Sequence, residues 1–61
     1  MKKLNVKEAL VYRDQGGYFR YTCRDAAGQI LYESEQRFRS GHAARREIQR
    51  RWPSCRVNFG V

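Results

Sequence analysis

The hydrophobic pattern between residues 11 and 48 changes from a period of two residues to a period of four. This change constrains the fold more than any other feature of the sequence. Alternation with period two is typical of a strand with one buried face, and a period close to 3.6 is typical of a helix with one buried face. The order of the patterns predicts three short strands followed by one helix. We therefore expect an α+β domain.

Three β-rich stretches precede the predicted helix, and turns that contain glycine separate them. The first stretch covers residues 9–13 and the second covers residues 18–24, with Asp14-Gln15-Gly16-Gly17 between them. Glycine in such a turn supplies the positive φ that a hairpin requires. The third stretch, residues 29–34, follows a second turn at residues 25–28. Consecutive hairpins predict a three-stranded antiparallel sheet.

The second stretch alternates most regularly, so it predicts which side chains share a face of the sheet. One face is apolar and is expected to face the core: Phe19, Tyr21 and Cys23. We expect the opposite, open face to present five basic, aromatic and hydroxyl side chains: Arg13, Tyr18, Arg20, Thr22 and Arg24. In the third stretch, Ile30 and Tyr32 are expected on one side of the sheet and Leu31 on the other.

Ser40 and Pro53 mark the expected ends of the helix. Serine is a preferred N-cap residue, and proline does not continue a helix. Between them Ala44, Ile48 and Trp52 recur every four residues, which predicts a narrow apolar stripe packed against the sheet. The helix also carries four arginines: Arg45, Arg46, Arg50 and Arg51. Four helix side chains are expected to point away from the apolar stripe: His42, Arg46, Gln49 and Arg50.

The chain alternates again after Pro53, where the apolar residues are Cys55, Val57, Phe59 and Val61. This pattern predicts a fourth strand within residues 54–61. The strand can extend the sheet of its own domain or pair across a subunit interface, and the sequence does not choose between these arrangements. An apolar edge strand that nothing covers promotes aggregation.

The chain has 61 residues, of which 13 are basic and 6 acidic, so its formal net charge is +7. This length predicts one domain, residues 1–61, with its core in residues 9–52, and a folded chain that buries roughly 60% of its extended surface. The longest uncharged apolar stretch is far shorter than the ~20 residues of a membrane span. We therefore expect a cytoplasmic protein without a membrane partner.

The positive charge is concentrated in residues 37–56, which hold seven arginines and a single acidic residue, Glu47. Such a block attracts phosphate backbones, because each cation that neutralises a phosphate releases a counterion. A solvated helix face that keeps a small protein soluble explains the same charge. The charge alone is compatible with both interpretations.

No group of residues in the sequence indicates catalysis or metal binding. His42 is the single histidine and is expected on the exposed side of the first helical turn. Asp14 and Asp25 lie in turns, where aspartate side chains bond to the local backbone. Cys23 and Cys55 lack metal-ligand spacing and are expected to be free thiols that pack like small apolar residues. The sequence therefore predicts a non-enzymatic protein without a cofactor, a metal or a small-molecule substrate.

The stretch from residue 11 to residue 48 resembles the YegP-like family of small domains. The resemblance rests on residue types that occur in the order the family pattern expects: Tyr12-Arg13-Asp14, Gly17, Phe19-Arg20-Tyr21, Gly28, Ile30, Ser34-Glu35, Phe38, Ser40, Ala43-Ala44 and Ile48. The chain departs from the pattern at Ala27, where the family has asparagine, at Gly41, where it has lysine, and in its added C-terminal strand.

The YegP-like resemblance implies a three-stranded antiparallel sheet packed by one helix, present as a tandem pair or as a single copy that forms a homodimer. This chain holds one copy, so the resemblance implies a homodimer, although the added strand alters the expected interface. The order of elements also resembles the arm-type DNA-binding domains of phage integrases. Those domains place the open face of a three-stranded sheet in a DNA groove. A compact basic chain of this length also suits an accessory protein of a phage or prophage.

Two functions of different classes fit these features. The first is weak binding of DNA or RNA through the arginines and aromatic residues of the open sheet face and the arginines of the helix, since a β-surface can enter the major groove. The second is a homodimeric protein-interaction module that binds no nucleic acid and uses its charge for solubility. Salt-sensitive binding favours the first function, and salt-tolerant self-association favours the second.

Overall fold

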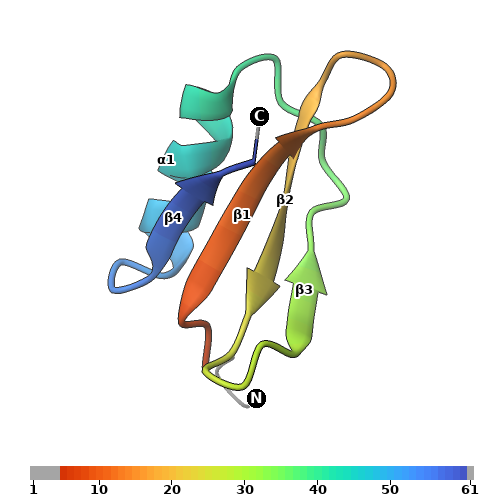
Figure 1. Cartoon of the computed structure of the whole chain (residues 1–61). Coiled ribbons are helices and arrows are strands. Elements are labelled where there is room, and N and C mark those ends of the chain that lie inside the picture. The colour runs from red at the N-terminus through yellow and green to blue at the C-terminus, as the bar shows by residue number, and fades with distance from the viewer. Residues whose placement is uncertain (1–4, 61) are drawn as a thin grey trace.

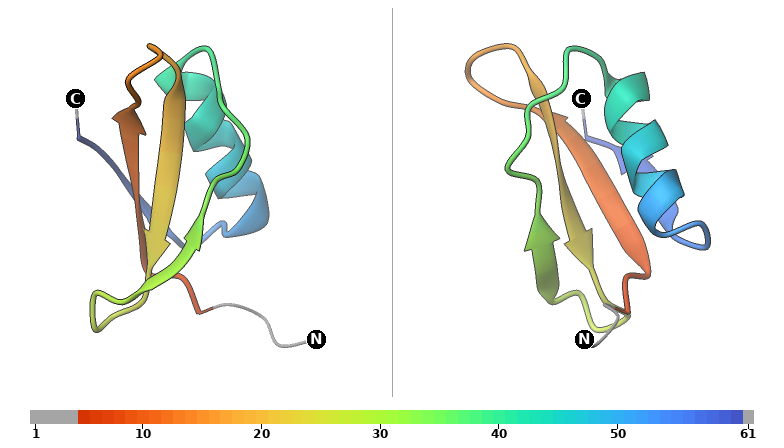
Figure 2. Two further views of the ribbon diagram at one scale, coloured as in Figure 1. Left: turned by 90° about the vertical axis from the view of Figure 1, so that its right-hand side faces the viewer. Right: turned by 180° about the vertical axis from the view of Figure 1, so that it is seen from behind.

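The structure, a computed structural model, describes residues 5–60. Its elements follow the order β1 (Glu8–Arg13), β2 (Phe19–Arg24), β3 (Ile30–Glu33), α1 (Gly41–Arg51) and β4 (Arg56–Phe59). The strands form one sheet in the order β3-β2-β1-β4 (Figure 1). The helix forms a separate layer on one face of this sheet (Figure 2). The predicted α+β class and the order of elements are therefore confirmed.

The sheet is mixed because β4 joins it in the parallel direction. β1 pairs with β2 and β2 pairs with β3 in the antiparallel direction, as the two hairpin turns predict. β4 pairs with β1 in parallel, with Ala9 opposite Val57. The helix carries the chain across the sheet from β3 at one edge to β4 at the other. The fourth strand thus extends the domain's own sheet, while Val61, predicted within it, lies outside the described residues.

The two hairpin turns have the same hydrogen-bonding scheme. In each turn an aspartate, Asp14 or Asp25, accepts hydrogen bonds at its Oδ1 atom from the backbone N–H groups two and four residues later, over 2.9 to 3.0 Å. The third residue after each aspartate is a glycine, Gly17 or Gly28, with φ of 84° and 86°. These values lie in the left-handed region that glycine adopts without a steric penalty. The predicted turn role of both aspartates is confirmed.

The helix ends lie where the sequence predicts them. The Ser40 Oγ accepts a hydrogen bond from the Ala43 backbone N–H over 3.1 Å, so Ser40 is the N-cap. The last helical residue is Arg51, and the Trp52 N–H donates to the Ile48 carbonyl over 2.7 Å before Pro53 redirects the chain. Ala44 and Ile48 are fully buried against the sheet.

The hydrophobic core lies between α1 and the sheet. Its members come from every layer of the fold: Val6, Ala9, Val11, Tyr21, Cys23, Ala44, Ile48 and Cys55. Trp52 and Val57 pack partly against this cluster. The core thus reaches beyond residues 9–52 at both ends, because Val6 precedes β1 and Cys55 precedes β4.

The third strand departs from simple alternation. A register shift between Cys23 and Arg24 pairs Cys23 with Tyr32 and Arg24 with Ile30, which leaves Leu31 as an extra residue. Leu31 and Tyr32 both pack against the core, whereas Ile30 is exposed. The expected sharing of a face by Ile30 and Tyr32 is therefore wrong, because an extra residue in one strand breaks the period of two.

Candidate nucleic-acid interface

Arg20 lies on the open face of the sheet, but its side chain is bound to the protein. Its Nε and Nη2 atoms donate hydrogen bonds to the Ser34 carbonyl oxygen over 3.2 and 2.7 Å. Ser34 is buried, and its Oγ accepts from the Tyr21 backbone N–H over 3.0 Å. Hydrogen bonds to a charged donor are stronger than neutral ones. Arg20 therefore fixes the end of β3 to β2.

Arg24 belongs to a row of charges across the sheet. It lies opposite Glu8 on β1, and Glu8 lies opposite Arg56 on β4. Opposite charges on neighbouring strands attract each other across the sheet. Arg24 also donates from Nη1 to the Gly28 carbonyl over 3.5 Å. The negative charge of Glu8, opposite both arginines in the register, lowers the positive potential of this part of the open face.

The remaining predicted sheet residues do not join Arg20 and Arg24 in one exposed patch. Thr22 is only 7% exposed, so its hydroxyl is not available to a macromolecular partner. Arg13 lies opposite Phe19, and its guanidinium carbon is 5.1 Å from the centre of the Phe19 ring. Phe19 is on the helix side of the sheet. The prediction that Arg13 shares the open face is therefore wrong. Arg13 is two residues after the buried Val11, and residues two apart in a strand point to the same face of the sheet.

Tyr18 lies in the turn before β2 rather than within the strand. Its ring is 41% exposed, and the guanidinium carbon of Arg37 is 5.9 Å from the ring centre. The Arg37 Nε atom is also 3.5 Å from the Asp14 Oδ2 atom. Arg37 thus connects the β1–β2 turn to the loop that leads into the helix, and Tyr18 is part of this connection.

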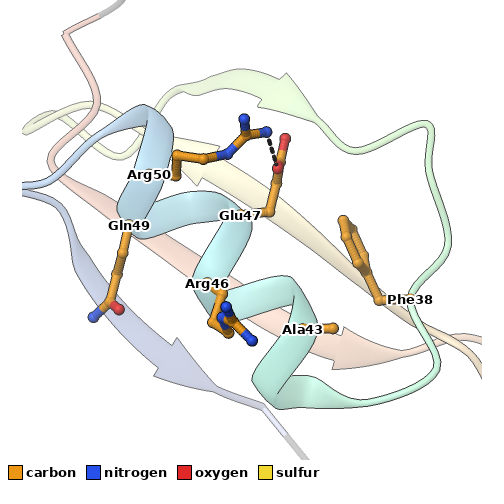
Figure 3. A pocket seen from close by; sticks show the side chains of 6 residues that line it. All are labelled: Phe38, Ala43, Arg46, Glu47, Gln49 and Arg50. Atoms are coloured by element: carbon orange, nitrogen blue, oxygen red, sulfur yellow. Dashed lines mark hydrogen bonds and ion pairs between the residues drawn. The ribbon is translucent and has the colours of Figure 1, made fainter.

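The solvent side of α1 presents three exposed arginines: Arg45, Arg46 and Arg50. Glu47 is the single acidic residue of the helix, and its Oε1 atom forms an ion pair with Arg50 Nη2 over 2.6 Å (Figure 3). The Arg50 side chain is still 76% exposed. Three arginines and one glutamate give this surface a higher formal charge than the open sheet face, where Glu8 and Glu33 accompany Arg20, Arg24 and Arg56.

Arg51 differs from the other helix arginines because it packs on aromatic rings. Its guanidinium carbon lies 4.9 Å from the centre of the Tyr32 ring and 4.8 Å from that of Trp52. Its Nη1 atom donates to the hydroxyl oxygens of Tyr32 and Tyr21 over 3.3 and 3.4 Å. Hydrogen bonding to Tyr32 raises the pKa of Arg51, and burial raises the pKa of Tyr21. Arg51 is thus held at the edge of the core.

An open depression of about 590 Å³ lies on the outer surface of the helix (Figure 3). It extends along residues of α1 and reaches Phe38 in the preceding loop; its lining consists of Phe38, Ala43, Arg46, Glu47, Gln49 and Arg50. Ala43 is the smallest of these side chains, so it leaves room between the Phe38 ring and the arginines. The sequence predicts that Arg46, Gln49 and Arg50 lie on this side of the helix, but the predicted nucleic-acid-binding residues did not include Gln49, which the helical spacing from His42 and Arg46 indicates.

Sequence reasoning also omitted two arginines of the loop before the helix. Arg37 and Arg39 are exposed, and both belong to the basic block of residues 37–56. That block is the signal that identifies them. Arg39 directly precedes the N-cap Ser40, so its charge lies at the N-terminal end of the helix.

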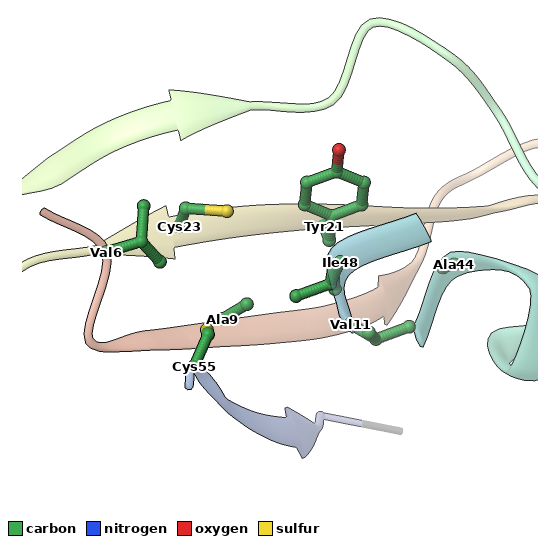
Figure 4. Packing of buried hydrophobic residues seen from close by; sticks show 8 residues of the cluster. All are labelled: Val6, Ala9, Val11, Tyr21, Cys23, Ala44, Ile48 and Cys55. Atoms are coloured by element: carbon green, nitrogen blue, oxygen red, sulfur yellow. The ribbon is translucent and has the colours of Figure 1, made fainter. Parts of the chain in front are cut away.

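Both cysteines are buried free thiols (Figure 4). Burial raises the pKa of Cys23 from 9.0 to about 11, and burial likewise raises the pKa of Cys55. Thiolate is the reactive form of cysteine, so both thiols are poor nucleophiles near neutral pH. The prediction that they are packing residues is confirmed.

His42 is exposed in the first turn of α1, as predicted. Residues 5–60 contain no group of three or more potential metal ligands. In the same range no helix is both long enough and apolar enough to cross a bilayer.

No family model, curated protein or solved structure matches this chain. The resemblance to YegP-like domains therefore stays a prediction.

Proposed function

We propose that this protein binds nucleic acid through the solvent side of α1, where Arg45, Arg46 and Arg50 contact phosphates. The observation that carries the proposal is the exposure of three guanidinium groups on a helix whose single carboxylate, Glu47, is already paired with Arg50. Guanidinium groups donate pairs of parallel hydrogen bonds that match the oxygens of a phosphate. No neighbouring acid of the helix competes for Arg45 or Arg46.

The loop before the helix contributes a further exposed arginine, Arg39, directly before the N-cap. Arg37 and Arg13 already interact with Asp14 and the Phe19 ring, so they are not assigned phosphate contacts. The net charge of +7 raises the local concentration of any polyanion and speeds its association. Because the binding energy comes from phosphates, the proposal predicts weak affinity that depends strongly on salt.

The open sheet face has a supporting part in this proposal. Arg20 is bound to the Ser34 carbonyl, so a phosphate contact by Arg20 competes with these hydrogen bonds. Arg24 and Arg56 lie opposite Glu8 in the register, and the negative charge of Glu8 repels a phosphate. We therefore assign the main contacts to α1 and expect the sheet arginines to add little affinity.

The test is fluorescence anisotropy with a labelled DNA duplex of about 20 base pairs, titrated between about 50 and about 200 mM NaCl. Each phosphate contact contributes about −0.9 to the slope of log affinity against log salt, so three contacts predict roughly a 40-fold loss over this range. Binding that is absent at about 50 mM NaCl, or that does not weaken with salt, overturns the proposal.

Self-association is the second candidate function, and the exposure of Phe59 favours it. Phe59 lies on the edge strand β4 and is 47% exposed, although its ring lies beside Gly41 of the helix. An edge strand with an exposed aromatic ring can pair with a second copy of the chain. Sedimentation equilibrium tests this: a dimer that persists at high salt and is lost in Phe59→Ser supports self-association, and a monomer throughout the concentration range excludes it.

A further inference from the structure

The outer side of α1 has an ordered arrangement of side chains beyond its charge. His42, Arg46 and Gln49 follow one another at spacings of four and three residues, which places them in one row along the helix. Arg45 and Arg50 flank this row, one on each side. All five residues are exposed, whereas Ala44 and Ile48 on the opposite side are buried. The helix thus presents a central row of hydrogen-bonding side chains between two lateral arginines.

We infer that α1 enters the major groove of duplex DNA, where Arg46 and Gln49 contact base edges while Arg45 and Arg50 hold the phosphates on either side. This inference rests on the proposed function and names its substrate class; on duplex DNA it reassigns Arg46 from a phosphate to a base edge. An α-helix fits the major groove, whose width is about 12 Å. α1 has 11 residues, which corresponds to a length of about 16 Å. It forms the outermost layer on its side of the sheet (Figure 2).

The central row has the chemistry that base edges require. Arginine donates a pair of hydrogen bonds to the O6 and N7 atoms of guanine, and glutamine pairs with the N6 and N7 atoms of adenine. Within residues 5–60, neither Arg46 nor Gln49 has a side-chain hydrogen bond or ion pair with the protein. Both line the open depression beside Ala43, so their polar ends are accessible from solvent.

The same surface is less suited to single strands and to duplex RNA. Single strands are bound by stacking bases on aromatic side chains, and the outer side of α1 carries no phenylalanine, tyrosine or tryptophan. Phe38 at its border packs with Tyr21 at 6.1 Å between ring centres, and Trp52 is covered by Arg51. The major groove of A-form RNA is too deep and narrow for side chains to contact its bases. These features favour duplex DNA.

The test is a selection from a pool of DNA duplexes that share fixed ends and a random central segment, performed in parallel with the wild type and the Gln49→Ala and Arg45→Ala variants. The wild type is expected to enrich a short motif. Gln49→Ala is expected to lose discrimination at one position of that motif by about tenfold or more. Arg45→Ala is expected to keep the motif while binding every sequence more weakly. Thermal unfolding of both variants confirms that they are folded.

The outcomes separate the inference from the function on which it rests. Salt-sensitive binding without any enriched motif overturns base contact and leaves phosphate binding intact. A complete absence of binding to the pool at low salt overturns both. A motif that Gln49→Ala enriches unchanged also overturns the inference, because the sequence is then recognised without the Gln49 side chain.

Discussion

The guanidinium group of Arg20 and the carbonyl oxygen of Ser34 are joined by two hydrogen bonds of 3.2 and 2.7 Å. Ser34 in turn accepts from the Tyr21 N–H through Oγ and donates from its own N–H to the Tyr21 carbonyl over 2.8 Å. At the end of β3, the side chain and the backbone N–H of Ser34 together make the hydrogen bonds to β2 that two backbone groups make in a regular β-ladder. The alternating pattern of β2 places Arg20 on the open face of the sheet, but its hydrogen bonds to Ser34 make it a structural residue.

Replacement of Ser34 by alanine is expected to destabilise the fold. The substitution removes the acceptor of the Tyr21 N–H in a buried site, and an unsatisfied buried donor costs about 1–3 kcal/mol. Urea unfolding, monitored by tryptophan fluorescence, measures the change in the free energy of unfolding. The matched control is Ser54→Ala, at an exposed turn position where the expected effect is within about 0.5 kcal/mol. Equal stability of Ser34→Ala and the wild type contradicts the structural role of this serine.

Arg51 and Arg50 are expected to differ in their contribution to stability although they are neighbours. Arg51→Ala removes contacts with the Tyr32 and Trp52 rings and a 3.7 Å ion pair with Glu47, so we expect a loss of about 1 kcal/mol. Arg50→Ala removes one exposed ion pair with Glu47, which is worth about 0.3–0.5 kcal/mol. Parallel thermal unfolding of the two variants measures the difference. A larger loss for Arg50→Ala argues against the packing of Arg51 on the rings.

The stability of the protein is expected to fall at alkaline pH because of Cys23. Burial raises the pKa of this thiol from 9.0 to about 11, so the unfolded chain loses the proton at lower pH than the folded chain. The contribution of the protonated thiol is complete below pH 9 and is lost as pH rises through 11. Under reducing conditions the melting temperature of the wild type should therefore fall more steeply across this range than that of Cys23→Ala. Tyr21 and Cys55 contribute equally to both proteins, so parallel curves refute the assignment to Cys23.

Asp25 is expected to stabilise its turn as a hydrogen-bond acceptor rather than as a charge. Its Oδ1 atom accepts from the N–H groups of Ala27 and Gln29, both over 2.9 Å. Asp25→Ala removes both bonds and is expected to cost about 1–2 kcal/mol. Asp25→Asn keeps the Oδ1 acceptor and is expected to be close to the wild type in chemical denaturation. If Asn destabilises as much as Ala, the negative charge is the stabilising feature.

Local signals in the sequence were sufficient for most of the fold. Each of these signals acts over a few residues. The aspartate and glycine residues predicted the two turns, Ser40 and Pro53 predicted the ends of the helix, and the two hydrophobic periods predicted the strands and the helix. The pairing of β4 with β1 is a long-range contact, and alternation within residues 54–61 carries no information about its partner or direction. The extra residue at Leu31 was hidden for a similar reason, because a β-bulge is defined by the neighbouring strand and not by the sequence of one strand.

The candidate site was predictable in composition but only partly in arrangement. The basic block of residues 37–56 identified the helix arginines, and helical spacing placed Arg46 and Arg50 on the solvent side. Spacing did not reveal that Arg51 is held by Tyr32 and Trp52, which come from other segments of the chain. It also did not reveal that Arg20 is bound to Ser34, since that bond depends on how β3 ends.

The central claim is that phosphates bind α1 and not the open sheet face. Two double variants remove the same charge from each surface: Arg45→Ala with Arg50→Ala on the helix, and Arg24→Ala with Arg56→Ala on the sheet. The decisive measurement is the anisotropy of a labelled DNA duplex across a salt series with each folded variant. We predict that the helix variant loses about tenfold or more in affinity and that its salt slope falls by about 2, while the sheet variant stays close to the wild type. An equal or greater loss in the sheet variant contradicts the account.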